Sequence, residues 1–210
     1  MKKNLILILS LLASLHFFGQ ENLFVKKEYN NLEEALKNPE MVYKLDLSNQ
    51  KLKLEGIDWS KFVNMENLTL KNDHLKEIPF GISSLKSLKS IDLSGNDFNV
   101  LPIEFSKLTN LEEVFLNDEK NINLPKTLSV LAKLPNLKSL HLENDRLKEL
   151  PKEILQFKSL ESLYLNQNIF KTIPRLETLH HLKFLDLKGN KINTGTEDLK
   201  NLNFGFQINF

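Results

Sequence analysis

Apolar residues recur along this chain at a spacing that neither a helix nor a strand would keep throughout. In LKSLHLENDRL, which begins at Leu137, the leucines are three residues apart at first and then two. A helix keeps steps of three or four, and a strand keeps steps of two. The LxL portion predicts a short strand whose two leucines point to the same side, and the flanking steps predict turns. Each such stretch is expected to form one coil of a larger structure.

Six other segments align with this stretch and repeat its pattern. The seven read VYKLDLSNQKL, MENLTLKNDHL, LKSIDLSGNDF, LEEVFLNDEKN, LKSLHLENDRL, LESLYLNQNIF and LKFLDLKGNKI. Their first residues are Val42, Met65, Leu88, Leu111, Leu137, Leu160 and Leu182, at successive offsets of 23, 23, 23, 26, 23 and 22 residues. Self-similarity at such a period indicates a solenoid, in which stacked coils share one core.

The common pattern LxxLxLxx(N/D)x(L/I/F) resembles the leucine-rich repeat family over residues 42–192. The resemblance implies an α/β solenoid, the leucine-rich repeat horseshoe of the 23-residue type, with short parallel strands on its concave face. Five repeats carry proline at their fifteenth position, which suits an irregular turn on the convex side. In the fourth repeat the three extra residues follow Pro125 and predict a longer convex helix that ends near Pro135.

The ninth position of such repeats normally holds an asparagine that both donates to and accepts from neighbouring backbone. Here the seven residues are Gln50, Asp73, Asn96, Glu119, Asp145, Asn168 and Asn190. An ionised carboxylate only accepts hydrogen bonds, so the three acidic residues cannot reproduce the complete ladder. We expect altered turns or bound water at those three coils.

Both ends of a solenoid need a cover for their open core. Before the repeats, Asn31 followed by Glu34 and a stop at Pro39 predicts a capping helix within residues 20–41. After them, residues 193–210 end in FGFQINF, whose Phe204, Phe206, Ile208 and Phe210 alternate with other residues and predict a closing strand.

The first nineteen residues predict a secretory signal peptide. Lys2 and Lys3 precede an apolar run, Leu5–Phe18, that is too short to span a bilayer. We expect cleavage after Gly19 or Gln20, no membrane span afterwards, and a final location outside the cell or in its envelope, as periplasm or cell surface. Since extracellular leucine-rich repeat proteins of animals and plants usually carry cysteine-bearing caps, the resemblance favours a bacterial exported protein.

Composition narrows the possible chemistry. Without Lys2 and Lys3, 26 of the 28 basic residues remain against 27 acidic ones, so general affinity for nucleic acid is not expected. The chain has no cysteine, which excludes disulfides, thiol catalysis and cysteine-ligated metals within it. Phosphate loops and protease or kinase motifs are lacking, and the adjacent His180 and His181 read as outer surface. We expect no enzyme activity, no cofactor and no metal.

The exposed strand positions of the concave face are the second, third, fifth, seventh and eighth of each repeat. Together they hold six lysines and nine carboxylates, a mixed and slightly acidic surface that suits a protein partner. In the fifth-position column Phe115, His141 and Tyr164 are consecutive, and Phe184 lies nearby at a third position. Aromatic side chains are enriched at binding hot spots, although they also favour strands.

The sequence therefore predicts a non-catalytic protein-binding module. The aromatic residues Phe115, His141, Tyr164 and Phe184 would anchor the partner, and four carboxylates, Glu113, Glu143, Asp92 and Asp186, would orient it. Two alternatives stay open: a carbohydrate-binding surface on the same aromatic residues, and a structural envelope protein that docks through its C-terminal strand. A glycosidase pair is disfavoured, since Glu113 and Glu143 lie more than about 13 Å apart along the backbone.

Overall fold

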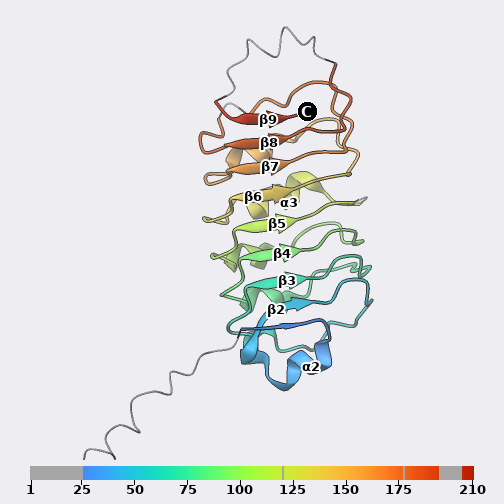
Figure 1. Cartoon of the computed structure of the whole chain (residues 1–210), viewed down its shortest axis with the longest axis vertical. Helices are drawn as coiled ribbons and strands as arrows, with labels where there is room; N and C mark the ends of the chain where they lie inside the picture. The colour runs from blue at the N-terminus through green and yellow to red at the C-terminus, as the bar shows by residue number, and fades with distance from the viewer. Residues whose placement is uncertain (1–25, 120, 177, 194–204) are drawn as a thin grey trace, which may run out of the picture.

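A computed structural model describes residues 26–119, 121–176, 178–193 and 205–210 of the chain. The expected signal peptide and parts of both expected caps, residues 20–25 and 194–204, lie outside the described residues. Within them, nine parallel strands form one open sheet in chain order, from β1 to β9 (Figure 1). The strands are β1 Lys27–Tyr29, β2 Val42–Asp46, β3 Asn67–Thr69, β4 Ser90–Asp92, β5 Glu113–Phe115, β6 Ser139–His141, β7 Ser162–Tyr164, β8 Phe184–Asp186 and β9 Gln207–Asn209.

Equivalent repeat positions face one another across the sheet. Asp92 pairs with Phe115, Phe115 with His141, His141 with Tyr164, and Tyr164 with Asp186. The two leucines of each LxL portion turn inward, as the fully buried Leu140 and Leu142 of one coil illustrate. The predicted solenoid of parallel strands is confirmed, and each coil adds one layer to a continuous core.

The opposite side of the solenoid consists mainly of short 3₁₀ helices. These are η2 Trp59–Lys61, η3 Phe80–Ser84, η4 Ile103–Lys107 and η5 Lys152–Gln156, whereas η1 Pro39–Met41 leads directly into β2. Pro79, Pro102 and Pro151 each occupy the cap position before one of them, as expected for a residue that fixes φ without donating an N–H. The fourth repeat instead forms the predicted longer helix, α3 Leu124–Leu131, which ends four residues before Pro135.

The eighth position of every repeat adopts the left-handed backbone conformation. Its occupants are Asn49, Asn72, Gly95, Asp118, Asn144, Gln167 and Gly189, with φ between 57° and 73°. Glycine, asparagine and aspartate tolerate this conformation best, so the local sequence suits the turn that follows each strand. This turn directs the ninth residue into the space between coils.

The predicted capping helix and a closing strand are both present among the described residues. Asn31 caps α2 Leu32–Lys37, and its side chain accepts a hydrogen bond from the Glu34 backbone N–H. At the other end β9 pairs with β8, and Phe206 and Ile208 pack on the core. Two details differ from the sequence prediction. Strand β1 was not predicted, and Phe210 is half exposed instead of joining the apolar face.

Candidate functional site

Three of the predicted anchor residues form a continuous ring stack on the solvent-facing side of the sheet, here called the sheet face. The ring centroids of Phe115 and His141 are 3.9 Å apart, and those of His141 and Tyr164 are 4.1 Å apart at an angle of 5°. Phe184 extends the group, since its ring lies 5.5 Å from Tyr164 at 56°. Phe115, Tyr164 and Phe184 are half-buried, whereas His141 is only 8% exposed. We call these four residues the aromatic stack.

The parallel register explains why the stack forms. A strand of three residues presents its first and third side chains on the sheet face, and in-register pairing places equal positions side by side. Planar side chains at the fifth position of three consecutive coils therefore meet face to face. The ring faces that meet inside the stack cover one another, so the surface between Phe115 and Tyr164 consists largely of ring edges.

Glu113 and Glu143 meet at His141 from opposite sides. The Nε2 atom of His141 lies 3.3 Å from Glu113 Oε1, and its Nδ1 atom lies 3.6 Å from Glu143 Oε2. The hydrogen bond with His141 holds the pKa of Glu113 below its ordinary value, against the opposing effect of burial. The backbone separation expected for Glu113 and Glu143 does not prevent both side chains from reaching the same imidazole.

Asp92 and Asp186 continue the aromatic column at its two ends. Each carboxylate accepts a hydrogen bond from the backbone N–H two residues later, at Ser94 and Lys188 respectively, with a length of 2.9 Å. Asp186 Oδ1 also accepts from the Asn209 amide of β9. The structure thus brings all eight predicted site residues onto one continuous area of the sheet face.

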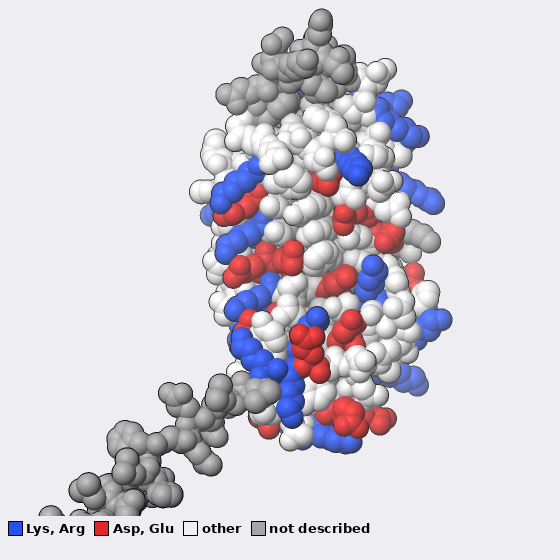
Figure 2. All heavy atoms as spheres, in the orientation of Figure 1, with Lys and Arg blue, Asp and Glu red and all other residues white. Residues whose placement is uncertain are grey.

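The second-position column forms an alternating ladder of ion pairs that sequence reasoning missed. It pairs Glu66 with Lys89, Glu112 with Lys138, and Glu161 with Lys183, at distances of 2.7 to 2.9 Å. In Figure 2 this ladder follows the left edge of the molecule as alternating red and blue, beside a mainly white central strip. The signal was available as Glu and Lys alternating at one repeat position. These lysines and carboxylates largely cancel one another, so they are not free charges.

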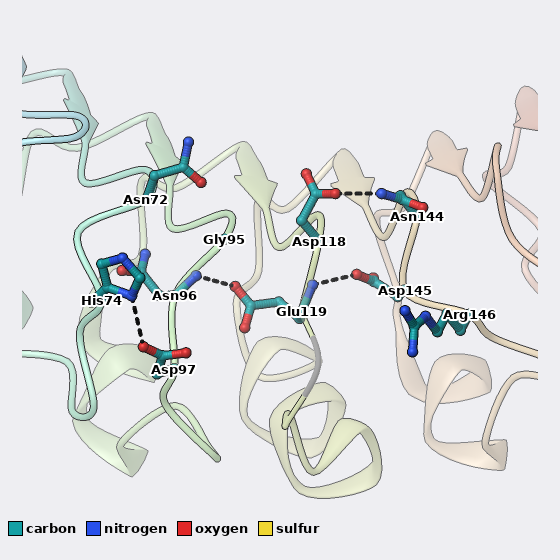
Figure 3. A pocket seen from close by; sticks show the side chains of 10 residues that line it. All are labelled: Asn72, His74, Gly95, Asn96, Asp97, Asp118, Glu119, Asn144, Asp145 and Arg146. Carbon is teal, nitrogen blue, oxygen red and sulfur yellow. Dashed lines mark hydrogen bonds and ion pairs between the residues drawn. The ribbon is translucent and has the colours of Figure 1, made fainter.

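A second candidate site is a hollow of about 570 Å³ beside the turns that follow the strands. Figure 3 shows its side chains, which include four carboxylates, Asp97, Asp118, Glu119 and Asp145. Asp97 lies 3.0 Å from His74, and Asp118 accepts a hydrogen bond from Asn144. Glu119 Oε1 accepts from the backbone N–H of Asn96, and Asp145 Oδ1 accepts from the backbone N–H of Glu119.

Two of these carboxyl groups favour their neutral forms. Burial raises the pKa of Glu119 to about 8, with added repulsion from Asp145, Asp97 and Asp118. Burial likewise raises the pKa of Asp145 to about 8, with added repulsion from Asp118 and Glu143. In both groups a backbone N–H donor partly opposes the shift. Near neutral pH each group therefore tends to keep its proton.

The acidic residues at the ninth position preserve only half of the expected ladder. Asn96 shows the complete arrangement: its Oδ1 accepts from the backbone N–H groups of Asp73 and Leu75, and its Nδ2 donates to the carbonyls of Leu70 and Leu93. Asp73 and Glu119 retain the accepting part, but among the described residues nothing hydrogen-bonds their buried Oδ2 and Oε2 atoms. The predicted loss of the donating part is therefore present at these coils.

Two searches of the described residues give negative results. No cluster of three or more histidine, aspartate or glutamate side chains has an arrangement that would hold a metal ion. None of the described helices combines the length and apolarity needed to cross a membrane.

Comparison with known families and structures places the chain among repeat proteins. The family described as Leucine rich repeat matches residues 135–192, and a second profile of the same description matches residues 87–108. No curated protein sequence matches the chain.

Several solved structures share its fold. A leucine-rich repeat protein of Leptospira interrogans is 28% identical with a TM-score of 0.51, and the match covers 79% of this chain and 54% of that one. Internalin C2 of Listeria monocytogenes is 23% identical with a TM-score of 0.60, covering 87% of this chain and 77% of that one. Human 5T4, also named Wnt-activated inhibitory factor 1, is 24% identical with a TM-score of 0.65, covering 81% and 69%. This chain thus spans about half of the Leptospira protein, and the other two likenesses concern the fold alone.

Proposed function

The chain is a leucine-rich repeat protein, and from this premise we propose that it binds a protein partner through its sheet face without catalysing a reaction. The observation that carries the proposal is the aromatic stack on an accessible, otherwise polar surface. Half-buried aromatic side chains supply large contact areas at little cost in conformational entropy, which suits them as anchors. The repeat fold supplies the general role of interaction module, and these residues give it a location.

The arrangement of charges supports the same surface. Along the ion-pair ladder, each carboxylate already has a lysine partner, so that column forms a polar rim with little net field. The carboxylates beside the stack, Asp92, Glu113, Glu143 and Asp186, have no ion pair with a lysine or arginine among the described residues. An apolar centre with charged groups along its margin matches the anatomy of protein interfaces.

A carbohydrate-binding surface has less support from the geometry. Sugar rings pack on the open faces of aromatic side chains, whereas here the faces of His141 are covered by Phe115 and Tyr164. Catalysis also lacks support, since Glu113 and Glu143 both engage His141, and the hollow of about 270 Å³ that Glu113 lines is a shallow one on the open sheet. Binding of a protein partner is the function that the stack supports best.

Affinity capture tests the proposal directly. The mature protein, beginning at Gln20, is used as bait in extracts of culture medium and cell envelope, beside a variant with Phe115→Ala and Tyr164→Ala. The matched control is Phe80→Ala, which removes an aromatic side chain that is 66% exposed on η3, away from the sheet face. We expect one partner to be retained by the parent and the control and lost by the folded double variant. Equal capture by all three would contradict the proposal.

Export is a separate part of the proposal, and it rests on Lys2, Lys3 and the apolar run after them. Mass spectrometry of the protein recovered from medium or envelope would give its N-terminus. We expect the chain to begin at Gln20 or Glu21, and an intact Met1 in the cell interior would contradict export.

A further inference from the structure

The aromatic stack has one end at which a ring face is not covered by another ring. Phe115 stacks on His141 on one side, and on the other side its register neighbour is Asp92. Among the described residues, no second aromatic ring contacts Phe115. Aspartate is much shorter than phenylalanine, so the Asp92 side chain is too small to cover the whole of this ring face.

The carboxylate at this end is held in place but not neutralised. Its Oδ1 accepts the Ser94 N–H, which turns the group toward its own strand end, and none of the described donors hydrogen-bonds its Oδ2. Glu113 lies two residues before Phe115 and contacts Ser90 and His141. The nearest lysine of the ion-pair ladder, Lys89, is engaged by Glu66 at 2.7 Å.

The other lysines on this part of the sheet face do not neutralise the carboxylates either. Lys71, at the seventh position of the preceding repeat, forms no ion pair within the described part of the chain, and Lys188 follows β8, four strands away. The surroundings of the free ring face therefore combine an aromatic plane with carboxylates that lack a basic counterpart.

We propose that the protein partner inserts an arginine side chain between Phe115 and Asp92, an inference that rests on the proposed function of the sheet face. A guanidinium group is planar, stacks on aromatic faces and donates two parallel hydrogen bonds to a carboxylate. Lysine carries a compact, strongly hydrated charge and lacks both the plane and the fork. The partner is thus a protein with an exposed arginine on a basic surface.

The chain itself offers a matched control for Asp92. Asp46 occupies the same repeat position on β2, and it accepts the equivalent turn hydrogen bond from Ser48 N–H at 3.0 Å. Asp46 is two strands away from Asp92 and has no ring beside it, because its register partner is Thr69. Asn at either position keeps the Oδ1 acceptor and removes the charge. Both variants therefore keep the hydrogen bond from the backbone N–H two residues later.

The test is a titration of the isotopically labelled protein with N-acetyl-L-arginine methylamide, followed by NMR. N-acetyl-L-lysine methylamide serves as the probe of equal charge. We expect saturable shifts of the Phe115 ring and Ser94 amide signals with the arginine probe, and weaker shifts with the lysine probe. Asp92→Asn should weaken arginine binding by about two- to fivefold, the range of an exposed ion pair, whereas Asp46→Asn should match the parent.

Equal binding of both probes, or equal loss in both variants, would overturn the inference, since either result reports bulk charge. The partner captured in the preceding experiment separates this inference from the proposed function. If Phe115→Ala with Tyr164→Ala abolishes capture but Asp92→Asn and Asp46→Asn bind the partner equally, the sheet face binds a partner without an arginine at Asp92. If the double variant captures normally, the proposed function itself fails.

Discussion

Replacing Glu119 by Gln should stabilise the protein near neutral pH and leave its stability in acid almost unchanged. Glu119 is 3% exposed, and its pKa rises from an ordinary value of 4.5 to about 8 in the folded protein. The folded state therefore favours the protonated carboxyl. Below about pH 4.5 both states are protonated, and Glu119 contributes nothing to the pH dependence.

Above that pH the unfolded chain releases the proton first, so the free energy of unfolding falls as pH rises toward 8. The slope is about 1.4 kcal/mol for each pH unit and each such group. For Glu119 the accumulated loss at pH 7 is about 3 kcal/mol. Gln is neutral in both states and can also donate a hydrogen bond. The variant should therefore exceed the parent by up to about 3 kcal/mol at pH 7 and by little at pH 4.5.

Urea unfolding between pH 4.5 and 8.5 measures this difference. Fluorescence of Trp59, the single tryptophan, reports the first repeat, and far-ultraviolet circular dichroism reports the whole solenoid. Both probes are needed because repeat proteins can unfold in parts. Glu149→Gln, at an exposed position, is the control and should follow the parent. If the gain in free energy of unfolding from Glu119→Gln were the same at every pH, the inference that Glu119 is buried as a neutral carboxyl would be refuted.

Three further predictions concern the solenoid itself. Asn96→Ala should lower the free energy of unfolding by about 3 to 5 kcal/mol, because several buried backbone groups lose their hydrogen-bond partners. Asn190 is only half-buried, so Asn190→Ala should lower it by less. Urea unfolding midpoints of the two variants measure the difference. Leu140→Ala empties a fully buried core position and should cost about 3 kcal/mol in the same assay. Removing residues 205–210 should unfold the last coils, because β9 pairs with β8 and covers it. The circular dichroism signal should then decrease. An intact fold that no longer associates with the envelope would instead favour docking through this strand.

Some properties of the carboxylates at the ninth position were predictable from the sequence, and others were not. An acidic residue cannot donate while it is ionised, so the loss of half the ladder was predictable from residue type alone. The preference of Glu119 and Asp145 for the neutral form was not predictable, because it depends on burial and on how close other carboxylates approach. Those approaches are set by side-chain conformations across coils that are 23 to 26 residues apart.

The arrangement of the sheet face was also predictable from the sequence only in part. The repeat period fixes which residues share a column, and the column fixes that Phe115, His141 and Tyr164 are neighbours. It does not fix that Glu113 and Glu143 reach the same imidazole, since that contact depends on rotamers that are free in the unfolded chain. Strand β1 also escaped prediction, because three residues without apolar alternation become a strand only where β2 offers an edge.

The sequence by itself determined the solenoid, the number of repeats and the composition of each surface column, because a repeated pattern of apolar residues allows only one way to bury them. Tertiary structure alone decided which charges are paired, which carboxyl groups are buried and which ring face remains open. Those properties arise between coils, where distances of a few ångströms depend on packing that no single repeat contains.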